Sequence, residues 1–183
     1  MTYLQMLWAI NKAVTKEAPV RVRKLCAPYT EPYYHLFYLL AKKSSVVVEL
    51  GVEKGRGSGS FCMGNKECQV YGLEAHRRPE IDDVISRFPN FHYLDKRSMP
   101  VPEEIPDQID VLHIDTEHSY SQADSEFHAY KSRLVPGSVV CFDDTHAMES
   151  DVLRFLVTLP YPMVLDDRLH YPCGYGVLFY MGE

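Results

Sequence analysis

Carboxyl and imidazole side chains gather at two places in the second half of the chain. Asp115 and, three residues later, His118 follow one short apolar run, and Asp143 and Asp144 follow the next one. Polar groups crowded at the end of a buried run are costly unless they bind something. The carboxyl ends of adjacent parallel strands lie at the same edge of a sheet, so we expect the two groups to meet there.

Three carboxylates at one place repel one another unless they are protonated or neutralised by a hard cation. We therefore expect Asp115, Asp143 and Asp144 to bind Mg²⁺ through their oxygen atoms. The alternative is that Asp115 and Asp144 only cap helices and hold no metal. We expect His118 to be the general base, because imidazole titrates near neutral pH, and His146 is a second candidate for this role.

A glycine-rich segment, residues 49–60, begins within the apolar run 46–50 and continues beyond it. Glycine lets the backbone turn sharply and approach a ligand closely at the carboxyl end of a strand. The segment lacks the G-x-G-x-x-G spacing of a dinucleotide site, because Ser60 stands where the third glycine would fall. This spacing argues against NAD, and an ordinary surface turn is the alternative to ligand binding.

Acidic and polar residues also follow the next two apolar runs. Glu74 follows the run 69–73, where a carboxylate can accept hydrogen bonds from ribose hydroxyls. Arg97 and Ser98 lie beyond the run 91–94, within reach of an adenine edge. Each signal is weak alone, since a surface glutamate after a strand is common. Together with the glycine-rich segment, they favour a ligand that contains adenosine.

These side chains require a parallel sheet to bring them together. Short apolar runs alternate with segments long enough for crossover helices, which is typical of βαβ units. We predict an α/β fold: a Rossmann-like, doubly wound mixed sheet of seven strands between two helical layers, with the last strand antiparallel. The predicted strands are residues 46–50, 69–73, 91–94, 111–114, 139–142, 163–165 and 176–181. The predicted helices are residues 3–16, 31–43, 59–63, 79–88, 120–134 and 149–159.

Length and charge narrow the class of protein. A chain of 183 residues and 21.1 kDa is long enough for one domain with a sizeable core. We expect residues 1–44 to form N-terminal helices of that domain and residues 45–183 to form its cofactor-binding part. The net charge of −6 argues against nucleic acid as a partner, because binding to phosphates needs a surplus of Lys and Arg.

Cysteine usage and hydropathy indicate the compartment. The five cysteines are odd in number and lack C-x-x-C spacing, so they indicate neither a disulfide framework nor a zinc site. No stretch approaches transmembrane length, and the first residues lack the features of a secretory signal. We expect a cytoplasmic protein without membrane contact that folds alone or as a simple homo-oligomer.

The order of four motifs resembles that of the class I S-adenosylmethionine-dependent methyltransferases. The motifs are VVVELGVEKGRGS, VYGLE, IDVLHIDTEHSY and LVPGSVVCFDDTH, and the resemblance extends from Ser45 to the C-terminus. The chain is most similar to the branch that includes macrocin-type sugar O-methyltransferases and cephalosporin hydroxylase-like proteins. The resemblance implies S-adenosylmethionine as cofactor, with Glu49 and Gly51 against its methionine and ribose portions and Glu74 at its ribose.

The same resemblance implies a metal-assisted reaction. Asp115, Asp143 and Asp144 match the Mg²⁺-binding carboxylates of the macrocin type, and His118 matches the base. Asp115 is expected to contact the cofactor as well as the metal. Two departures leave the acceptor pocket unassigned. Thr-Glu replaces the commoner Gly-Asp pair in the HIDTEHSY motif, and the extra N-terminal domain of the larger sugar enzymes is missing.

We therefore predict an enzyme that methylates a hydroxyl group of a small acceptor, such as a sugar, with the help of Mg²⁺. A sulfonium methyl donor is already activated, so the protein must align the acceptor and remove its proton. The predicted catalytic residues are His118 and Asp115. The alternatives are an NAD-dependent oxidoreductase and a cofactor-binding module without catalysis.

Overall fold

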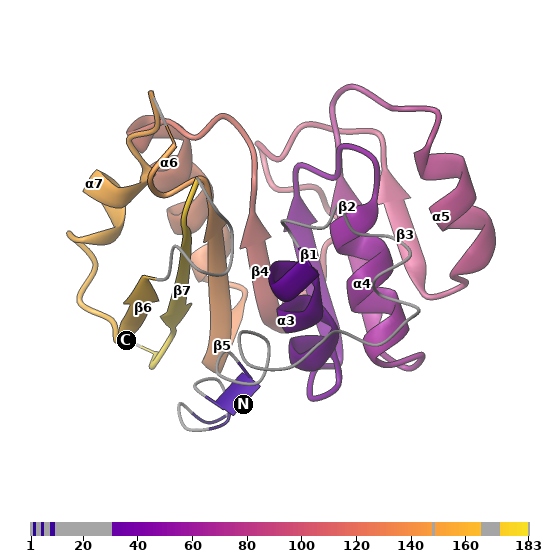
Figure 1. Cartoon of the computed structure of the whole chain (residues 1–183), viewed down its shortest axis with the longest axis horizontal. Helices are drawn as coiled ribbons and strands as arrows, with labels where there is room; N and C mark the ends of the chain where they lie inside the picture. Colours follow the sequence, from indigo (N-terminus) through magenta and orange to yellow (C-terminus); the bar gives the residue numbers. More distant parts are fainter. Residues whose placement is uncertain are drawn as a thin grey trace.

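Seven strands form one mixed sheet (Figure 1). The structure is a computed structural model that describes residues 2, 5, 8, 9, 31–147, 149–165 and 173–182. The strand order is β3-β2-β1-β4-β5-β7-β6. The bounds are β1 Val46–Leu50, β2 Gln69–Leu73, β3 Phe91–Leu94, β4 Ile109–Ile114, β5 Leu134–Asp143, β6 Met163–Leu165 and β7 Tyr175–Phe179. Strands β1 to β5 pair in parallel, and β7 pairs antiparallel with both β5 and β6.

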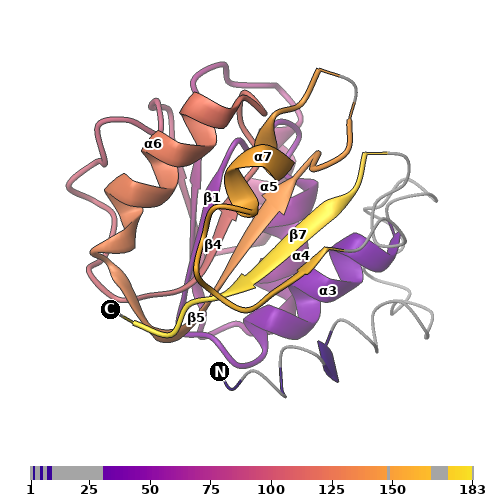
Figure 2. The same cartoon turned by 90° about the vertical axis from the view of Figure 1, so that its left-hand side faces the viewer.

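Helices cover both faces of this sheet (Figure 2). Helices α3 (Glu31–Ala41), α4 (Arg56–Gly64) and α5 (Ile81–Arg87) pack on one face, and α6 (Tyr120–Lys131) and α7 (Val152–Leu156) pack on the other. The predicted three-layer α/β fold is therefore confirmed. In the described part of the chain, no helix is both long enough and apolar enough to cross a membrane.

The central strand β1 separates two apolar cores. Successive side chains of a strand point to opposite faces, so a strand buried on both faces is apolar throughout. Val47 packs in the core under α3 and α4, with Phe37 and Phe61. Val48 packs in the core under α6 and α7, with Phe127. The uninterrupted Val-Val-Val run thus places the end of β1 in the middle of the sheet.

Strand β5 begins earlier than predicted. Leu134, the last residue of a predicted helix, pairs instead with Ile109, and the register shifts directly after this pair. The Ser138 hydroxyl accepts a hydrogen bond from the Val135 N–H at 2.9 Å and donates one to the Ile109 carbonyl at 2.6 Å. A side chain thereby replaces backbone ladder bonds. Sequence periodicity does not reveal such an irregularity.

Two helices also differ from their predicted bounds. Helix α4 begins at Arg56 although its sequence is rich in glycine, which lowers intrinsic helix propensity. Packing of this buried helix against α3 outweighs that propensity. Helix α7 covers only Val152–Leu156 of the predicted 149–159. The predicted helix over residues 3–16 lies almost wholly outside the described residues.

Candidate functional site

The carboxyl ends of β1, β2, β4 and β5 lie at the upper edge of the sheet in Figure 1. At this edge, the end of β1 at Gly51 lies between the ends of β2 and β4. The Gly51 N–H donates to the Leu73 carbonyl at 2.9 Å, and the Asp115 N–H donates to the Leu50 carbonyl at 2.8 Å. Gly51 has a φ of +87°, and a Cβ at this position would overlap the carbonyl oxygen of Asp115. Only glycine fits both requirements.

A cavity of about 470 Å³, called the large cavity below, opens beside the contact between Gly51 and Asp115. Its lining includes Gly51, Glu74, Arg97, Ser98 and Asp115, which come from loops after β1, β2, β3 and β4. These are residues that the sequence predicts to bind a cofactor. The structure thus brings them together around one space, while their contact with a cofactor stays a prediction.

The carboxylate of Glu74 is held in place at this cavity. Its Oε2 accepts a hydrogen bond from the Glu53 N–H at 3.0 Å, and its Oε1 accepts one from the His76 N–H at 2.8 Å. An ionised carboxylate has about four lone-pair sites, so it can accept further hydrogen bonds from a ligand. The loop after β3 is fixed as well, because the Tyr130 hydroxyl donates to the Ser98 carbonyl at 2.9 Å.

The imidazole of His118 lies between two carboxylates. Its Nε2 is 3.0 Å from Oδ1 of Asp115, and its Nδ1 is 3.1 Å from Oδ2 of Asp144. His118 and Asp144 have φ values of +51° and +53°, which are uncommon for residues other than glycine. Backbone conformations of this kind are strained and persist only where the surrounding structure holds them in place. They occur often at functional sites.

These carboxylates control the charge of His118. Burial alone lowers the pKa of an imidazole, but the hydrogen bond to Asp115 and the charges of Asp115, Asp144 and Asp143 raise the pKa of His118 above its ordinary value. Burial and the neighbouring Asp143 raise the pKa of Asp115 to about 6, while His118 opposes this rise. A positively charged imidazole therefore offsets the repulsion between the carboxylates.

A second polar chain lies buried beside this group. His113 Nδ1 is 3.2 Å from Oε1 of Glu49, and His113 Nε2 is 2.6 Å from the Tyr33 hydroxyl. The Ser58 hydroxyl donates to the other oxygen of Glu49. His113 is thus a buried histidine with a hydrogen-bond partner at each ring nitrogen. Glu49 does not line the large cavity but a smaller one of about 40 Å³, which also adjoins Asp115.

Sequence comparison agrees with this geometry. A family model described as a methyltransferase domain matches residues 48–145, more than half of the chain. The chain belongs to the methyltransferase-domain family. The matched segment contains Gly51, Glu74, Asp115, His118 and Asp144. No curated protein matches the sequence of this methyltransferase.

Solved structures share the methyltransferase fold at low sequence identity. The O-methyltransferase TomG of Streptomyces achromogenes, in complex with S-adenosylmethionine, is 18% identical with a TM-score of 0.60, over 95% of this chain and 90% of that one. An O-methyltransferase of Bacillus cereus, in complex with S-adenosylhomocysteine, is 13% identical with a TM-score of 0.60, over 98% and 92% of the two chains. The fibrillarin pre-rRNA processing protein of Methanococcus jannaschii is 16% identical with a TM-score of 0.63, over 78% and 69%.

Membership in this family confirms the predicted methyltransferase and enzyme class. The specific resemblance to macrocin-type enzymes stays a prediction. Nδ1 of His146, the second candidate base, lies 2.8 Å from the Thr145 hydroxyl, whereas both ring nitrogens of His118 face carboxylates.

The predicted Mg²⁺ ligands of the methyltransferase do not form a metal site as they stand. Oxygens of Asp115 and Asp144 face His118, and Oδ1 of Asp143 accepts a hydrogen bond from the Asp144 N–H at 2.7 Å. Among the residues that the structure describes, no group of three or more His, Cys, Asp or Glu side chains is placed to hold a metal ion. The arrangement therefore does not fit the predicted ion, and Mg²⁺ stays a prediction from the sequence.

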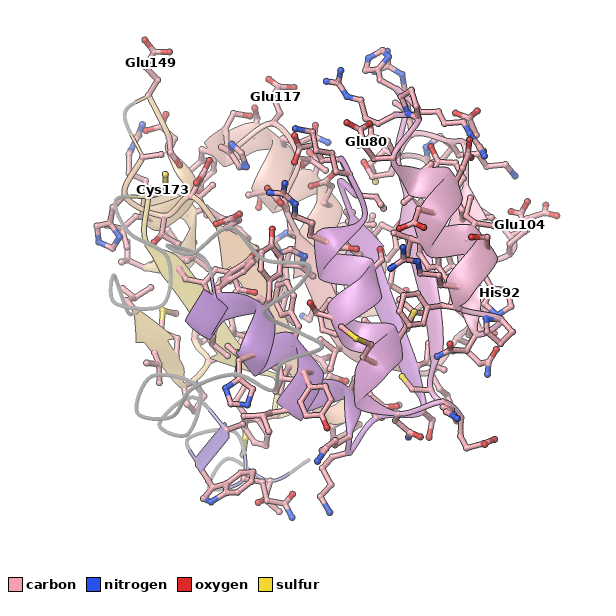
Figure 3. All side chains as sticks on the ribbon, turned by 45° about the vertical axis from the view of Figure 1, so that its right-hand side comes forward. Glu80, His92, Glu104, Glu117, Glu149 and Cys173 are labelled. Carbon is pink, nitrogen blue, oxygen red and sulfur yellow. The ribbon has the colours of Figure 1, made fainter. Side chains whose placement is uncertain are left out.

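Sequence reasoning missed one part of the cavity wall. Thr116 and Gln122 line the large cavity, and both donate hydrogen bonds to Glu126, a buried residue of α6. The spacing of Gln122 and Glu126, which places both on one side of a helix, is the signal that was available. Glu117, part of the Thr-Glu departure from the family pattern, also lines this cavity, and its exposed side chain points outward at the upper edge (Figure 3).

Proposed function

We propose that the methyltransferase binds S-adenosylmethionine in the large cavity and methylates a hydroxyl oxygen of a small acceptor such as a sugar. The observation that carries this proposal is the Asp115–His118–Asp144 group, whose Asp115 lines the same cavity as Glu74. Two solved neighbours, TomG and the Bacillus cereus enzyme, are O-methyltransferases in complex with S-adenosylmethionine and S-adenosylhomocysteine.

The residues of the cavity fit an adenosine-containing cofactor. The volume of about 470 Å³ lies within the range of small-molecule sites. Gly51 allows close approach of the backbone, and the fixed carboxylate of Glu74 suits ribose hydroxyls, which are hydrogen-bond donors. S-adenosylmethionine, when bound, supplies a methyl group that is activated by its positively charged sulfur.

The protein then has to orient an acceptor and remove its proton. Asp115 lines both cavities and lies next to Nε2 of His118, so we propose that Nε2 is the nitrogen that serves the acceptor. In our proposal the acceptor hydroxyl takes the place of Asp115 at Nε2 and gives its proton to that atom. Asp144 meanwhile holds Nδ1 of His118 and stabilises the imidazolium that forms.

No step of this mechanism is assigned to a metal, because the three carboxylates do not form a metal site in the described residues. The macrocin-type assignment, the sugar acceptor and a cytoplasmic location stay parts of the proposal that the sequence suggests. An acceptor hydroxyl with a lowered pKa would ease the demand on His118, so phenols belong in an acceptor panel beside sugars.

The experiment is transfer of labelled methyl from S-adenosylmethionine to such a panel, followed by mass spectrometry of the products. An O-methylated product that depends on His118 supports the proposal. Tight binding of S-adenosylmethionine without turnover of any acceptor would instead favour a cofactor-binding module without catalysis. Binding of NAD and not of S-adenosylmethionine would contradict the proposal outright.

A further inference from the structure

A carboxylate is buried behind the wall of the large cavity. Glu126 is 0% exposed and lies on the inner side of α6, among Ala123, Phe127 and Tyr130 of the apolar core. A carboxylate in such surroundings is strongly destabilising unless hydrogen bonds satisfy its oxygens. Both oxygens of Glu126 accept hydrogen bonds from side chains of the cavity wall. Glu126 itself does not line the cavity.

The two donors are neutral groups. The Thr116 hydroxyl donates to Oε2 of Glu126 at 2.7 Å, and the Gln122 amide nitrogen donates to Oε1 at 2.8 Å. An ionised carboxylate accepts hydrogen bonds and cannot donate one. Gln122 must therefore turn its nitrogen toward Glu126 and its carbonyl oxygen away, and Thr116 has given its only proton.

This fixed direction determines what the wall can recognise. Thr116 and Gln122 line the same cavity as Glu74. Thr116 keeps only oxygen lone pairs, and the Gln122 carbonyl oxygen is turned away from Glu126, so both offer acceptors that suit a ligand group that donates. The second amide proton of Gln122 stays on the nitrogen that faces Glu126. In a purine, a 6-amino group donates hydrogen bonds and a 6-oxo group accepts them. The adenine of the proposed cofactor carries the 6-amino group.

We propose that Glu126 is a positioning residue that sets the hydrogen-bond direction of Thr116 and Gln122, and thereby makes the cavity select a 6-amino purine over a 6-oxo purine. This inference rests on the proposed function, because it concerns the adenine end of the cofactor. Gln122 is then a specificity-determining residue, and Glu126 acts only through it and Thr116.

The test compares binding of S-adenosylhomocysteine and S-inosylhomocysteine by titration calorimetry. The two ligands differ at position 6, which carries an amino or an oxo group, and at N1, which is an acceptor in adenine and carries a proton in the 6-oxo purine. The wild-type protein should bind the adenosyl compound about 10- to 100-fold more tightly. The 6-oxo group of the inosyl compound is a hydrogen-bond acceptor and would face the acceptor oxygens of Thr116 and Gln122. In Glu126→Gln, the new amide can donate to Gln122, which is then free to turn, and the preference should fall to about threefold or less.

Asp124→Asn is the matched control. It is the same carboxylate-to-amide change on the same helix, but the Asp124 side chain is 44% exposed and faces His128. This variant should keep the full preference. Gln122→Ala removes the proposed acceptor directly, and its side chain is only partly buried. Gln122→Ala should also lose the preference for the adenosyl compound. If Glu126→Gln does not fold, Gln122→Ala alone tests the proposed selection.

The outcomes separate the two proposals. Failure of the wild-type protein to bind S-adenosylhomocysteine would overturn the proposed function. Tight binding of both compounds with equal affinity would overturn only the role of Glu126 and Gln122. An undiminished preference in folded Glu126→Gln and in Gln122→Ala would also overturn it. A merely structural role of Glu126 would weaken both compounds equally and leave their ratio unchanged.

Discussion

The Nδ1 atom of His118 lies 3.1 Å from Oδ2 of Asp144, although the two residues follow different strands of the sheet. Asp115 faces the other ring nitrogen at 3.0 Å. An imidazole between two carboxylates is stabilised in its charged form. Where the imidazole is protonated, its proton must leave before His118 can act as a base.

The pH dependence of the reaction follows from this proton. A base must be unprotonated, so kcat/KM should rise with pH through the pKa of His118, which lies above its ordinary 6.5. Asp144→Asn removes a charge that raises this pKa, so the midpoint should move to lower pH while the maximum falls about tenfold or more. A pH profile of kcat/KM measures both. Asp151→Asn, an exposed change in the same loop, should alter neither, and an unmoved midpoint in Asp144→Asn would exclude the proposed coupling.

Removal of the imidazole should separate chemistry from cofactor binding. His118→Ala should lower kcat by about a hundredfold or more while the affinity for S-adenosylhomocysteine stays nearly unchanged. Single-turnover kinetics and calorimetry measure the two effects. His146→Ala is the control, since His146 contacts Thr145 and should retain activity. Normal turnover by His118→Ala would show that another group removes the proton.

Chelation tests the metal that the sequence predicts. In the structure, the imidazole of His118 lies between Asp115 and Asp144. We expect methyl transfer to survive dialysis against EDTA within about twofold, because no step in the proposed mechanism uses a metal. Loss of activity that Mg²⁺ restores would instead show that the carboxylates rearrange around an ion, as the resemblance to macrocin-type enzymes implies.

Gly51→Ala should damage both the fold and the site. A residue other than glycine at positive φ costs about 1–2 kcal/mol, and here the added Cβ also overlaps the Asp115 carbonyl. We expect the free energy of unfolding in urea to fall by about 3 kcal/mol or more, with loss of ligand binding.

Gly182→Ala provides the comparison for Gly51→Ala. Gly182 has a φ of +89°, but a Cβ there would lie 3.4 Å from its nearest neighbour, a carbon of Pro136. In this variant the free energy of unfolding should fall only by the cost of positive φ, about 1–2 kcal/mol, and the ligand affinity should stay unchanged. Equal losses in both variants would mean that the contact between Gly51 and Asp115 has no special role.

The sheet could be predicted from the sequence because each strand of its centre is a short apolar run followed by polar residues. Val46–Leu50 and Ile109–Ile114 are examples, and their ends meet as predicted. Periodicity failed at β5, where Leu134 pairs at an irregularity and the Ser138 hydroxyl donates a hydrogen bond to the Ile109 carbonyl. That contact involves residues far apart in the chain, so no local pattern reveals it.

The sequence predicted that the candidate residues gather at one edge of the sheet, but it did not predict how they are arranged there. Carboxylates after adjacent strands must come close, and they do. The position of the His118 imidazole between them goes with positive φ at His118 and Asp144, which the residue types do not predict. Glu126 escaped notice for a related reason, since a glutamate on a helix is usually exposed and its burial here depends on partners outside its own turn.

The most direct test of the central claim is titration calorimetry of S-adenosylmethionine into wild-type protein and into Glu74→Ala. Glu74 is fixed at the cavity by two backbone N–H groups and is expected to bind the ribose. The account predicts one cofactor per chain for the wild type, and binding weaker by about 1–3 kcal/mol in Glu74→Ala. Exposed Glu80→Ala should bind like the wild type. No binding by the wild type, or unchanged affinity in folded Glu74→Ala, would contradict the assignment of this cavity to the cofactor.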